Sequence, residues 1–436
     1  MSDNASSSTK SNINDQIKTA QQLGEFIGIS PTPFHATQNL AELYTQDGYT
    51  ELKLNDRWSL NPKGRYFVTR NDSSIVAFKN PGAYARGLKL VGAHTDSPCL
   101  KIKPNPELNS QGYWQLGVEV YGGVLLHPWF DRDLSIAGRV SGILESGEAF
   151  NQLIDFKDPV AIIPSLAIHL DREANNASTV NAQKHLPIIL GRRNTEHDGS
   201  SFNSLLLAYC RKDAAQVLDF ELSCYDTQAP SIIGIDKEFI AAARLDNLLS
   251  SYIGTRAFLD AQTPDDQCVL FVSTDHEEVG SASTSGAQGP FLKSVLERIC
   301  PDPQSLSQCI SQSMLISCDN AHGVHPNFAD KHDQNHGPIL NGGPVIKINT
   351  NQRYATNSIS SAAYQRVCAS AGVPFQQFVV RSDMACGSTI GPIMAAELGI
   401  DTIDVGAPQW AMHSIRETAG TLDCEYLRTS LETFLS

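Results

Sequence analysis

Hydrophobic residues recur at helical spacing near the start of the chain and in short runs soon after it. Between Asp15 and Gly48, two stretches of helical spacing flank the proline-rich turn 29–33, which predicts two helices. Short runs rich in β-branched and aromatic residues follow at 65–69 and 74–78, and these predict strands. The apolar run 88–93, which leads into His94, predicts a buried strand.

After Lys237 the pattern alternates between helix and strand. Helical spacing covers 246–259, 290–299, 358–372 and 392–398, and apolar runs cover 269–272, 313–318, 344–348 and 378–380. Such alternation is typical of a mostly parallel sheet covered by helices. The sequence therefore predicts the α/β class, with a mixed, mostly parallel sheet.

A segment with a different residue pattern interrupts this domain. From 101 to 232, short β-prone runs alternate with Gly, Pro and Asn turns, which predicts a β-rich insertion. Within it, 171–193 is polar and weakly patterned and is expected to form a mobile loop. The expected domains are thus 15–100 with 233–436, and the insertion 101–232. The Ser- and Asn-rich residues 1–14 are expected to be a mobile tail.

Composition and net charge indicate which classes of partner are not expected. The 436 residues are 41% hydrophobic and 18% charged, and the formal net charge is −14, so we expect neither nucleic acid nor an anionic membrane as a partner. None of the ten cysteines forms a C-x-x-C pair, and we interpret them as core residues in a reducing compartment. No run approaches the length of a membrane span, and a cytoplasmic protein is expected.

The adjacent acids Glu277 and Glu278 are the most informative pair in the chain. They follow the apolar run 268–272, and sites in open α/β sheets lie at the carboxyl ends of strands. Two carboxylates this close repel one another. A divalent metal removes that conflict if one acid binds it and the other acts as a general base.

Four further segments supply candidate ligands. His94 and Asp96 stand two residues apart at a strand end, so both side chains can face one side; a structural His–Asp hydrogen bond is the alternative. Asp246 begins a helix and could equally be its N-cap. Asp319 follows another predicted strand, and His413 lies in a short loop near the C-terminus.

The set predicts a two-metal hydrolase. His94, Asp246, Glu278, Asp319 and His413 offer only nitrogen and oxygen donors, which suit Zn²⁺, Co²⁺ or Mn²⁺. Five ligands exceed the three that a catalytic zinc usually takes, and one bridging Asp between two ions resolves the count. The chain has neither an H-E-x-x-H nor a G-x-S-x-G motif, which disfavours single-zinc proteases and serine hydrolases.

Several long motifs occur in one order along nearly the whole chain. They are Ser30–His35, Gly92–Pro98, Trp129–Leu134, Ala167–Leu170, Arg244–Asn247, Asp275–Ser281, Asp319–Asn327, Asn351–Thr356 and Ala411–Glu417. On these motifs the chain resembles the aspartyl aminopeptidase family of co-catalytic zinc peptidases. The loop Ser382–Gly387 departs from the family pattern, which has a Thr-Pro-like pair before Cys-Gly.

The resemblance implies a role for each residue. His94 and Asp319 resemble the ligands of one ion, Glu278 and His413 those of the other, and Asp246 the bridging carboxylate. Glu277 resembles the general base and Asp96 the carboxylate behind His94. It further implies a zinc exopeptidase-like catalytic domain, two zinc ions per protomer, and an insertion that forms a dimerisation domain. Related enzymes assemble as tetrahedral dodecamers, so a homo-oligomer is expected.

The expected activity is removal of N-terminal Asp or Glu from peptides. Lys347 and Arg381 are candidates for the cation that binds the acidic side chain, and His169 for a residue that reaches a neighbouring subunit's site. Two alternatives stay open. The same centre could hydrolyse an N-acyl amino acid or another small amide, or the chain could be an inert peptide-binding shell.

Overall fold

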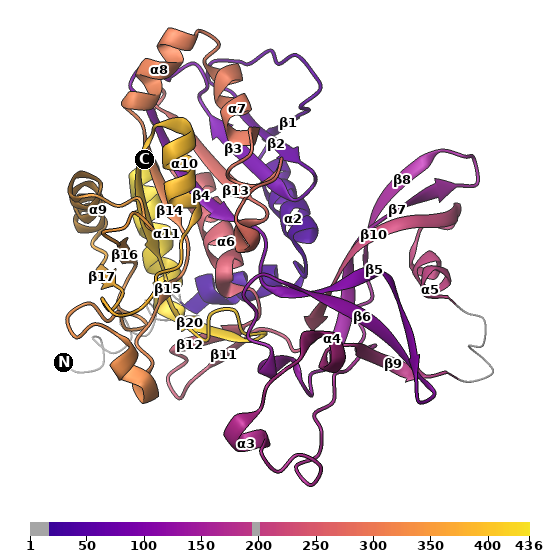
Figure 1. Ribbon diagram of the computed structural model, residues 1–436. Coiled ribbons are helices and arrows are strands. Elements are labelled where there is room, and N and C mark those ends of the chain that lie inside the picture. The colour runs from indigo at the N-terminus through magenta and orange to yellow at the C-terminus, as the bar shows by residue number, and fades with distance from the viewer. Residues whose placement is uncertain (1–16, 194–200) are drawn as a thin grey trace, which may run out of the picture. The chain divides into compact units, whose positions relative to one another are not determined.

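The computed structural model describes residues 17–193 and 201–436. These residues divide into two units, and each is described by itself (Figure 1). Unit 1 comprises the described residues up to Ser97, with Pro230–Met412 and Glu417–Ser436, and unit 2 comprises Pro98–Ala229 and His413–Arg416. The expected tail, 1–14, lies outside the described residues.

A nine-stranded sheet forms the centre of unit 1, in the order β1-β2-β3-β13-β4-β14-β18-β16-β17. Its strands are β1 (Thr50–Leu52), β2 (Arg65–Arg70), β3 (Ser74–Lys79), β4 (Leu88–His94), β13 (Cys268–Thr274), β14 (Met314–Cys318), β16 (Val345–Ile348), β17 (Gln376–Val379) and β18 (Asp401–Gly406). Five of its eight pairings are parallel, namely β1–β2, β13–β4, β4–β14, β14–β18 and β16–β17. The predicted mixed, mostly parallel sheet is therefore confirmed.

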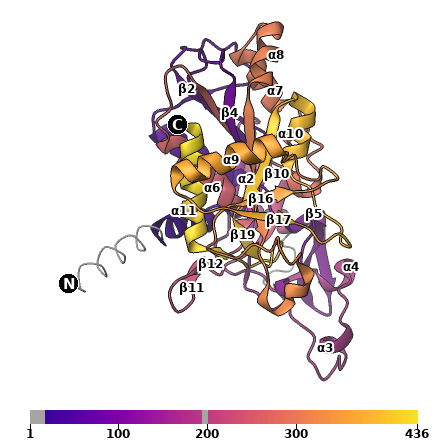
Figure 2. The same ribbon diagram turned by 90° about the vertical axis from the view of Figure 1, so that its left-hand side faces the viewer.

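Helices cover both faces of this sheet. One face carries helical residues 17–28, α2 (Pro33–Gln46), α6 (Leu245–Asp260), α9 (Ser358–Ala371) and α11 (Thr421–Leu435). The other carries α7 (Phe291–Ile299), α8 (Pro303–Ser311) and α10 (Ile390–Leu398). Alternate residues of each strand serve the two cores: Phe271 faces the first and Leu270 the second, as the period of two requires. Figure 2 shows α9 and α11 on the side nearest the viewer.

The β4–β13–β14 region positions the acidic residues. These strands are parallel neighbours, and Thr274 at the end of β13 pairs with His94 at the end of β4. Their carboxyl ends therefore meet at one edge of the sheet. A smaller sheet completes unit 1, with β11 (Ser231–Ile233), β12 (Phe239–Ala242), β15 (Ala321–His322), β19 (Pro408–Trp410) and β20 (Glu417–Gly420).

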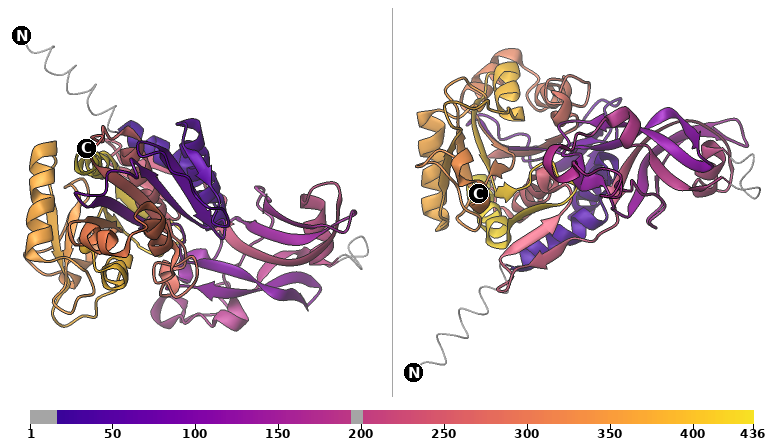
Figure 3. Two further views of the ribbon diagram at one scale, coloured as in Figure 1. Left: turned by 90° about the horizontal axis from the view of Figure 1, so that it is seen from above. Right: turned by 60° about the horizontal axis from the view of Figure 1, so that its bottom comes forward.

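Unit 2 contains an antiparallel sheet in the order β8-β7-β10-β5-β6-β9. Its strands are drawn in purple and magenta in Figure 3. The strands are β5 (Cys99–Ser110), β6 (Tyr113–Tyr121), β7 (Leu134–Leu144), β8 (Ala149–Asp155), β9 (Ile188–Arg192) and β10 (Ala214–Asp226), with the short helices η1 (His127–Trp129), α3 (Ala174–Ala177), α4 (Ala182–His185) and α5 (Phe202–Tyr209). Its core includes Trp129, Leu134 and Ile188.

The segment 171–193 is more regular than its polar pattern suggests. It contains α3, α4 and β9. The Asn181 side chain accepts from the Lys184 N–H and caps α4, and β9 pairs with β6 through Ile188 and Ile189. Over 17–193 and 201–436, none of the helices has both the length and the apolar character needed to cross a bilayer.

Candidate metal centre

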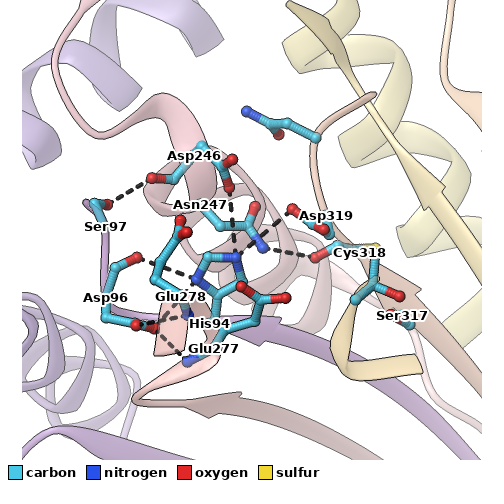
Figure 4. A network of polar contacts seen from close by, with 12 residues as sticks. His94, Asp96, Ser97, Asp246, Asn247, Glu277, Glu278, Ser317, Cys318 and Asp319 are labelled. Atoms are coloured by element: carbon cyan, nitrogen blue, oxygen red, sulfur yellow. Dashed lines mark hydrogen bonds and ion pairs between the residues drawn. The ribbon is translucent and has the colours of Figure 1, made fainter. Parts of the chain in front are cut away.

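His94, the last residue of β4, is the centre of the polar network in Figure 4. Its side chain is 1% exposed. Its Nδ1 lies 3.1 Å from the Asp96 carbonyl oxygen and 3.3 Å from Asp96 Oδ1. Two acceptors on this side favour a proton on Nδ1, which leaves the lone pair on Nε2. The Ser251 hydroxyl donates to the His94 carbonyl oxygen at 2.7 Å and ties β4 to α6.

Two carboxylates converge on the other ring nitrogen. His94 Nε2 lies 3.4 Å from Asp246 Oδ1 and 3.6 Å from Asp319 Oδ1, and one donor atom from each of the three residues lies within 4.8 Å of the other two. Bonds of about 2.1 Å place neighbouring ligands of a tetrahedral zinc about 3.4 Å apart. The spacing of these three donors therefore fits a metal ion.

Asp246 is held by backbone contacts at the start of α6. Its N–H donates to Glu417 Oε2 at 2.9 Å, and the Ser97 hydroxyl donates to its carbonyl oxygen at 2.5 Å. Neither Asp246 nor Asn247 has helical dihedral angles, so the carboxylate is placed by these contacts rather than by a regular first turn. The Asn247 amide donates to the Cys318 carbonyl oxygen at 2.8 Å and ties α6 to the end of β14.

Asp319 follows β14 directly and divides its two oxygens between two partners. Oδ1 faces His94, and Oδ2 accepts from Lys347 Nζ at 3.2 Å. Lys347 lies on β16, its side chain is 2% exposed, and Nζ also donates to the Asn320 carbonyl oxygen at 3.2 Å. A buried cation needs such partners. Lys347 thereby fixes the orientation of the Asp319 carboxylate.

Glu277 and Glu278 begin the short helix η2 (Glu277–Val279) just after β13. His276 before them is left-handed, with φ of 64°. The Glu277 N–H donates to Asp96 Oδ1 and the Glu278 N–H to Asp96 Oδ2, each at 3.1 Å. Asp96 thus connects His94 to the backbone of both acids. One donor atom each of His94, Glu277 and Glu278 also lie within 4.8 Å of one another.

This concentration of acids shifts their pKa values. Burial, opposed by His94 and reinforced by Asp319, raises the pKa of Glu277 to about 8. Burial and Asp246 raise the pKa of Glu278 well above its usual value. Burial lowers the pKa of His94, but hydrogen bonds to Asp246, Asp319 and Asp96 outweigh it and leave the pKa well above its usual value. A divalent cation would reverse these shifts for the carboxyl groups.

His413 belongs to the segment His413–Arg416 of unit 2. Its Nδ1 lies 3.0 Å from the Gly123 carbonyl oxygen, a contact that favours a proton on Nδ1 and the lone pair on Nε2. That tautomer suits a metal ligand. Its role as a ligand stays a prediction.

The other two predicted substrate-binding residues lie in different surroundings. Arg381 contacts Asp383 through Nε at 2.9 Å and Nη2 at 2.7 Å, and its Nη1 donates to the Asp330 carbonyl oxygen. The Arg381 guanidinium is therefore already hydrogen-bonded to Asp383 and Asp330. His169 is exposed in a turn of unit 2. Both substrate roles stay predictions.

The sequence interpretation did not single out the residues that support the ligands. Glu417 is 1% exposed and accepts from Asp246, and it ends the motif Ala411–Glu417. Asp275 is 2% exposed, and burial, with the neighbouring Asp96, raises its pKa to about 6. Both acids lie inside the motifs Asp275–Ser281 and Ala411–Glu417, and this membership was the available signal in both cases.

Comparison with known proteins finds a family of zinc metalloproteases. A family model described as aminopeptidase I zinc metalloprotease (M18) matches residues 26–435. A curated relative from Stutzerimonas stutzeri, named probable M18 family aminopeptidase 2, is 55% identical over 422 residues, which cover 95% of this chain and 97% of the relative. The corresponding protein of Azotobacter vinelandii is also 55% identical, with the same coverage.

Solved structures share the fold over almost the whole chain. The cryo-EM structure of an Ape4–Nbr1 complex contains a similar chain, with a TM-score of 0.93 and 38% identity over 96% of this chain and 86% of that one. The mApe1 structure of Chaetomium thermophilum has a TM-score of 0.84 and 32% identity, over 97% of this chain and 98% of that one. The S. cerevisiae mApe1 dodecamer has a TM-score of 0.84 and 28% identity, over 96% of this chain and 97% of that one.

Proposed function

This chain belongs to the aminopeptidase I (M18) family of zinc metalloproteases, and on that premise we propose that it removes N-terminal Asp or Glu from peptides with two divalent metal ions, preferably Zn²⁺. The family makes it a metal-dependent peptide hydrolase. The observation that carries the proposal is the convergence of Asp246 and Asp319 on His94 Nε2. Membership in a peptidase family favours peptides over N-acyl amino acids.

Each residue of the centre has one task in this proposal. His94 and Asp319 would hold one ion, Glu278 and His413 would hold the other, and Asp246 would be a ligand of both. When bound, the ions supply Lewis acidity, which lowers the pKa of water and polarises the scissile carbonyl. Glu277 takes a proton from the attacking water and returns it to the leaving amine. Asp96 holds Glu277 in place through the 3.1 Å contact to its N–H.

The preference for an acidic N-terminal residue requires a cation near the substrate. Lys347 is the candidate closest to the centre, because its Nζ contacts the metal ligand Asp319. An ammonium has three N–H donors, and the contacts to Asp319 and Asn320 account for two of them. The third can meet a substrate carboxylate. Arg381 and His169 remain the further candidates.

The proposal includes a homo-oligomer. A relative of known structure is a dodecamer, and the resemblance assigns dimerisation to the insertion, expected at 101–232. His169 would then reach a neighbouring subunit's site. A cytoplasmic location remains part of the prediction.

The test is a set of initial rates on dipeptides with N-terminal Asp, Glu, Leu or Lys. Each is measured after chelation and after Zn²⁺, Co²⁺ or Mn²⁺ is restored. Metal-dependent cleavage confined to Asp and Glu is the expected result. Cleavage that favours Leu or Lys would contradict the specificity and retain the metal chemistry.

Glu277→Gln separates catalysis from metal binding. The variant should keep two ions per protomer and lose about 10²- to 10⁴-fold in rate. Glu297→Gln is the matched control, because Glu297 is an exposed residue of α7. Near-normal turnover by a fully loaded Glu277→Gln variant would exclude Glu277 as the general base.

A further inference from the structure

A closed loop carries the two glutamates of the metal centre. It begins at Asp275, directly after β13, and ends at Ser285, and we name residues 275–285 the glutamate loop. The Asp275 N–H donates to the Ser285 carbonyl oxygen at 3.2 Å and to the Ser74 hydroxyl at 2.9 Å. The Ser74 hydroxyl donates to the same carbonyl oxygen at 2.7 Å. Because Ser74 begins β3, these contacts fix the two ends of the loop to the central sheet.

The backbone of His276 sets the turn at the start of the glutamate loop. Its φ of 64° is left-handed, a conformation that His, Asn and Asp adopt more readily than most residues. The His276 N–H donates to Asp275 Oδ1 at 2.8 Å, and its carbonyl oxygen accepts from the Ser281 N–H at 2.7 Å. These contacts turn the chain immediately before Glu277.

The side chain of His276 reaches across the loop to its other end. Its Nδ1 lies 2.8 Å from Ser283 Oγ and 3.4 Å from Ser285 Oγ, and its Nε2 lies 3.5 Å from Asp275 Oδ2. The Ser283 hydroxyl also accepts from the Gly286 N–H at 2.9 Å. One imidazole therefore joins the first residues of the loop to its last ones.

The returning half of the loop is packed against its own backbone. A Cβ at Gly286 would lie 2.2 Å from the Ser281 carbonyl oxygen, and a Cβ at Gly289 would lie 2.2 Å from the Ser283 carbonyl oxygen. Segments packed this closely transmit a displacement to their neighbours. A shift of Ser283 is therefore passed to Ser281 and to the turn that holds the two glutamates.

The two glutamates are thus held from two directions. Asp96 accepts from both of their N–H groups from the side of β4, and His276 closes the loop from the side of β13. We infer that the His276 side chain is a positioning residue, which fixes the general base Glu277 and the ligand Glu278 through the glutamate loop. The role uses the two ring nitrogens as hydrogen-bonding atoms and needs no change of charge. The inference rests on the proposed function, because it takes Glu277 as the base.

The experiment compares His276→Ala with His276→Asn in metal-loaded enzyme, on the dipeptide that the wild type cleaves fastest. In His276→Ala, kcat should fall by about 10- to 100-fold, because a displacement of about 1 Å costs a catalytic group up to about 10²-fold. KM should stay within about twofold, since the lost contact serves the reaction and not substrate binding. Asn tolerates the left-handed conformation, and its amide can take the place of Nδ1 beside Ser283, so His276→Asn should keep most of the activity.

Ser283→Ala removes the partner of the imidazole and leaves the left-handed residue in place. It should lower kcat as well, and the double variant should lose about as much as His276→Ala alone, because residues that act through one contact are not additive. His336→Ala is the matched control, since His336 contacts Asp333 within its own loop at 2.7 Å and lies outside the motifs of the centre. Denaturant titrations of each variant separate a loss of activity from a loss of folding.

Several results would overturn the inference. They are a kcat of His276→Ala near that of the wild type, equal losses in His276→Ala and His276→Asn, and additive losses in the double variant. A raised KM with an unchanged kcat would assign His276 to substrate binding and would also refute it.

Failure of the proposed function gives a different result, because the wild type would then hydrolyse no peptide with any metal. In that case the Zn²⁺ affinity decides the inference, measured by competition with a chelator. It should be about tenfold weaker in His276→Ala than in the wild type, as for other groups that support a metal ligand. An unchanged affinity would refute the positioning of Glu278.

Discussion

Asp96→Asn is the substitution that tests the network around the metal centre most directly. The two side chains have almost the same shape, so the change alters charge and hydrogen bonding with little effect on packing. In the wild type the carboxylate accepts from the N–H groups of Glu277 and Glu278, each at 3.1 Å, and lies 3.3 Å from His94 Nδ1. An amide has one acceptor oxygen in place of two.

The expected loss of metal affinity follows from these contacts. One of the two backbone N–H groups loses its acceptor and meets an NH₂ group instead, and His94 loses the negative charge that raises its basicity. Loss of such a supporting carboxylate typically weakens metal binding by about 10- to 100-fold, which corresponds to about 1.4–2.7 kcal/mol. Because the backbone of one of the two glutamates is also released, the rate at saturating metal should fall as well.

The assay is a competition between the protein and a chromophoric chelator for Zn²⁺ at fixed pH. Asp236→Asn is the control, since Asp236 is exposed and lies outside the motifs of the centre. A Zn²⁺ affinity within threefold of the wild type, together with full activity, would show that Asp96 neither orients His94 nor holds the two glutamates.

Three further predictions concern the rest of the molecule. Asp246→Ala should lose both ions, measurable as metal content after gel filtration, because the bridging ligand is removed; retention of two ions per protomer would contradict the bridge. Lys347→Met should lower the preference for N-terminal Asp over Asn by about tenfold in kcat/KM, as one charged hydrogen bond predicts; an unchanged preference would exclude it as the specificity cation. Burial raises the pKa of Asp423 to about 7 although the N–H groups of Asn341 and Gly343 oppose it. The native state then holds an extra proton between about pH 4 and 7, so the stabilisation from this group is complete below about pH 4 and is lost as the pH rises through 7. In denaturant titrations the wild type should lose up to about 4 kcal/mol relative to Asp423→Asn over this range; parallel profiles would refute the shift.

The sequence predicted seven of the nine strands of the sheet, all except β1 and β18, but not the order of the strands. The apolar runs before His94, Glu277 and Asp319 each mark a strand end, and the parallel neighbours β13, β4 and β14 bring those ends to one edge. Hydrophobic periodicity is a local property, so it locates strand ends without specifying which strands are neighbours. The ligand motifs indicated only that these strand ends lie close together.

The supporting contacts could not be predicted because they join distant residues. Glu417 meets Asp246 171 positions away, and Asn247 reaches Cys318. Lys347 shows the same limit: its position on a strand was evident, but its contact with Asp319 depends on β16 and β14 both lying beside β18. The helices α8 and α11 were also not predicted, and α11 fills the core beneath α6 and α9.

The two buried acids Asp96 and Asp404 indicate how this fold keeps a charged edge ordered. Each is almost fully buried, and each accepts from backbone N–H groups or hydroxyls on segments that follow other strands. A buried carboxylate is stable only when its oxygens are hydrogen-bonded, so each acid requires the loops around it to keep their positions. Asp96 imposes this on the two glutamates, and Asp404 imposes it on the segments around Ala355 and Thr389. Asp96 therefore preorganises the metal centre, and its substitution should disturb metal binding before it disturbs the sheet.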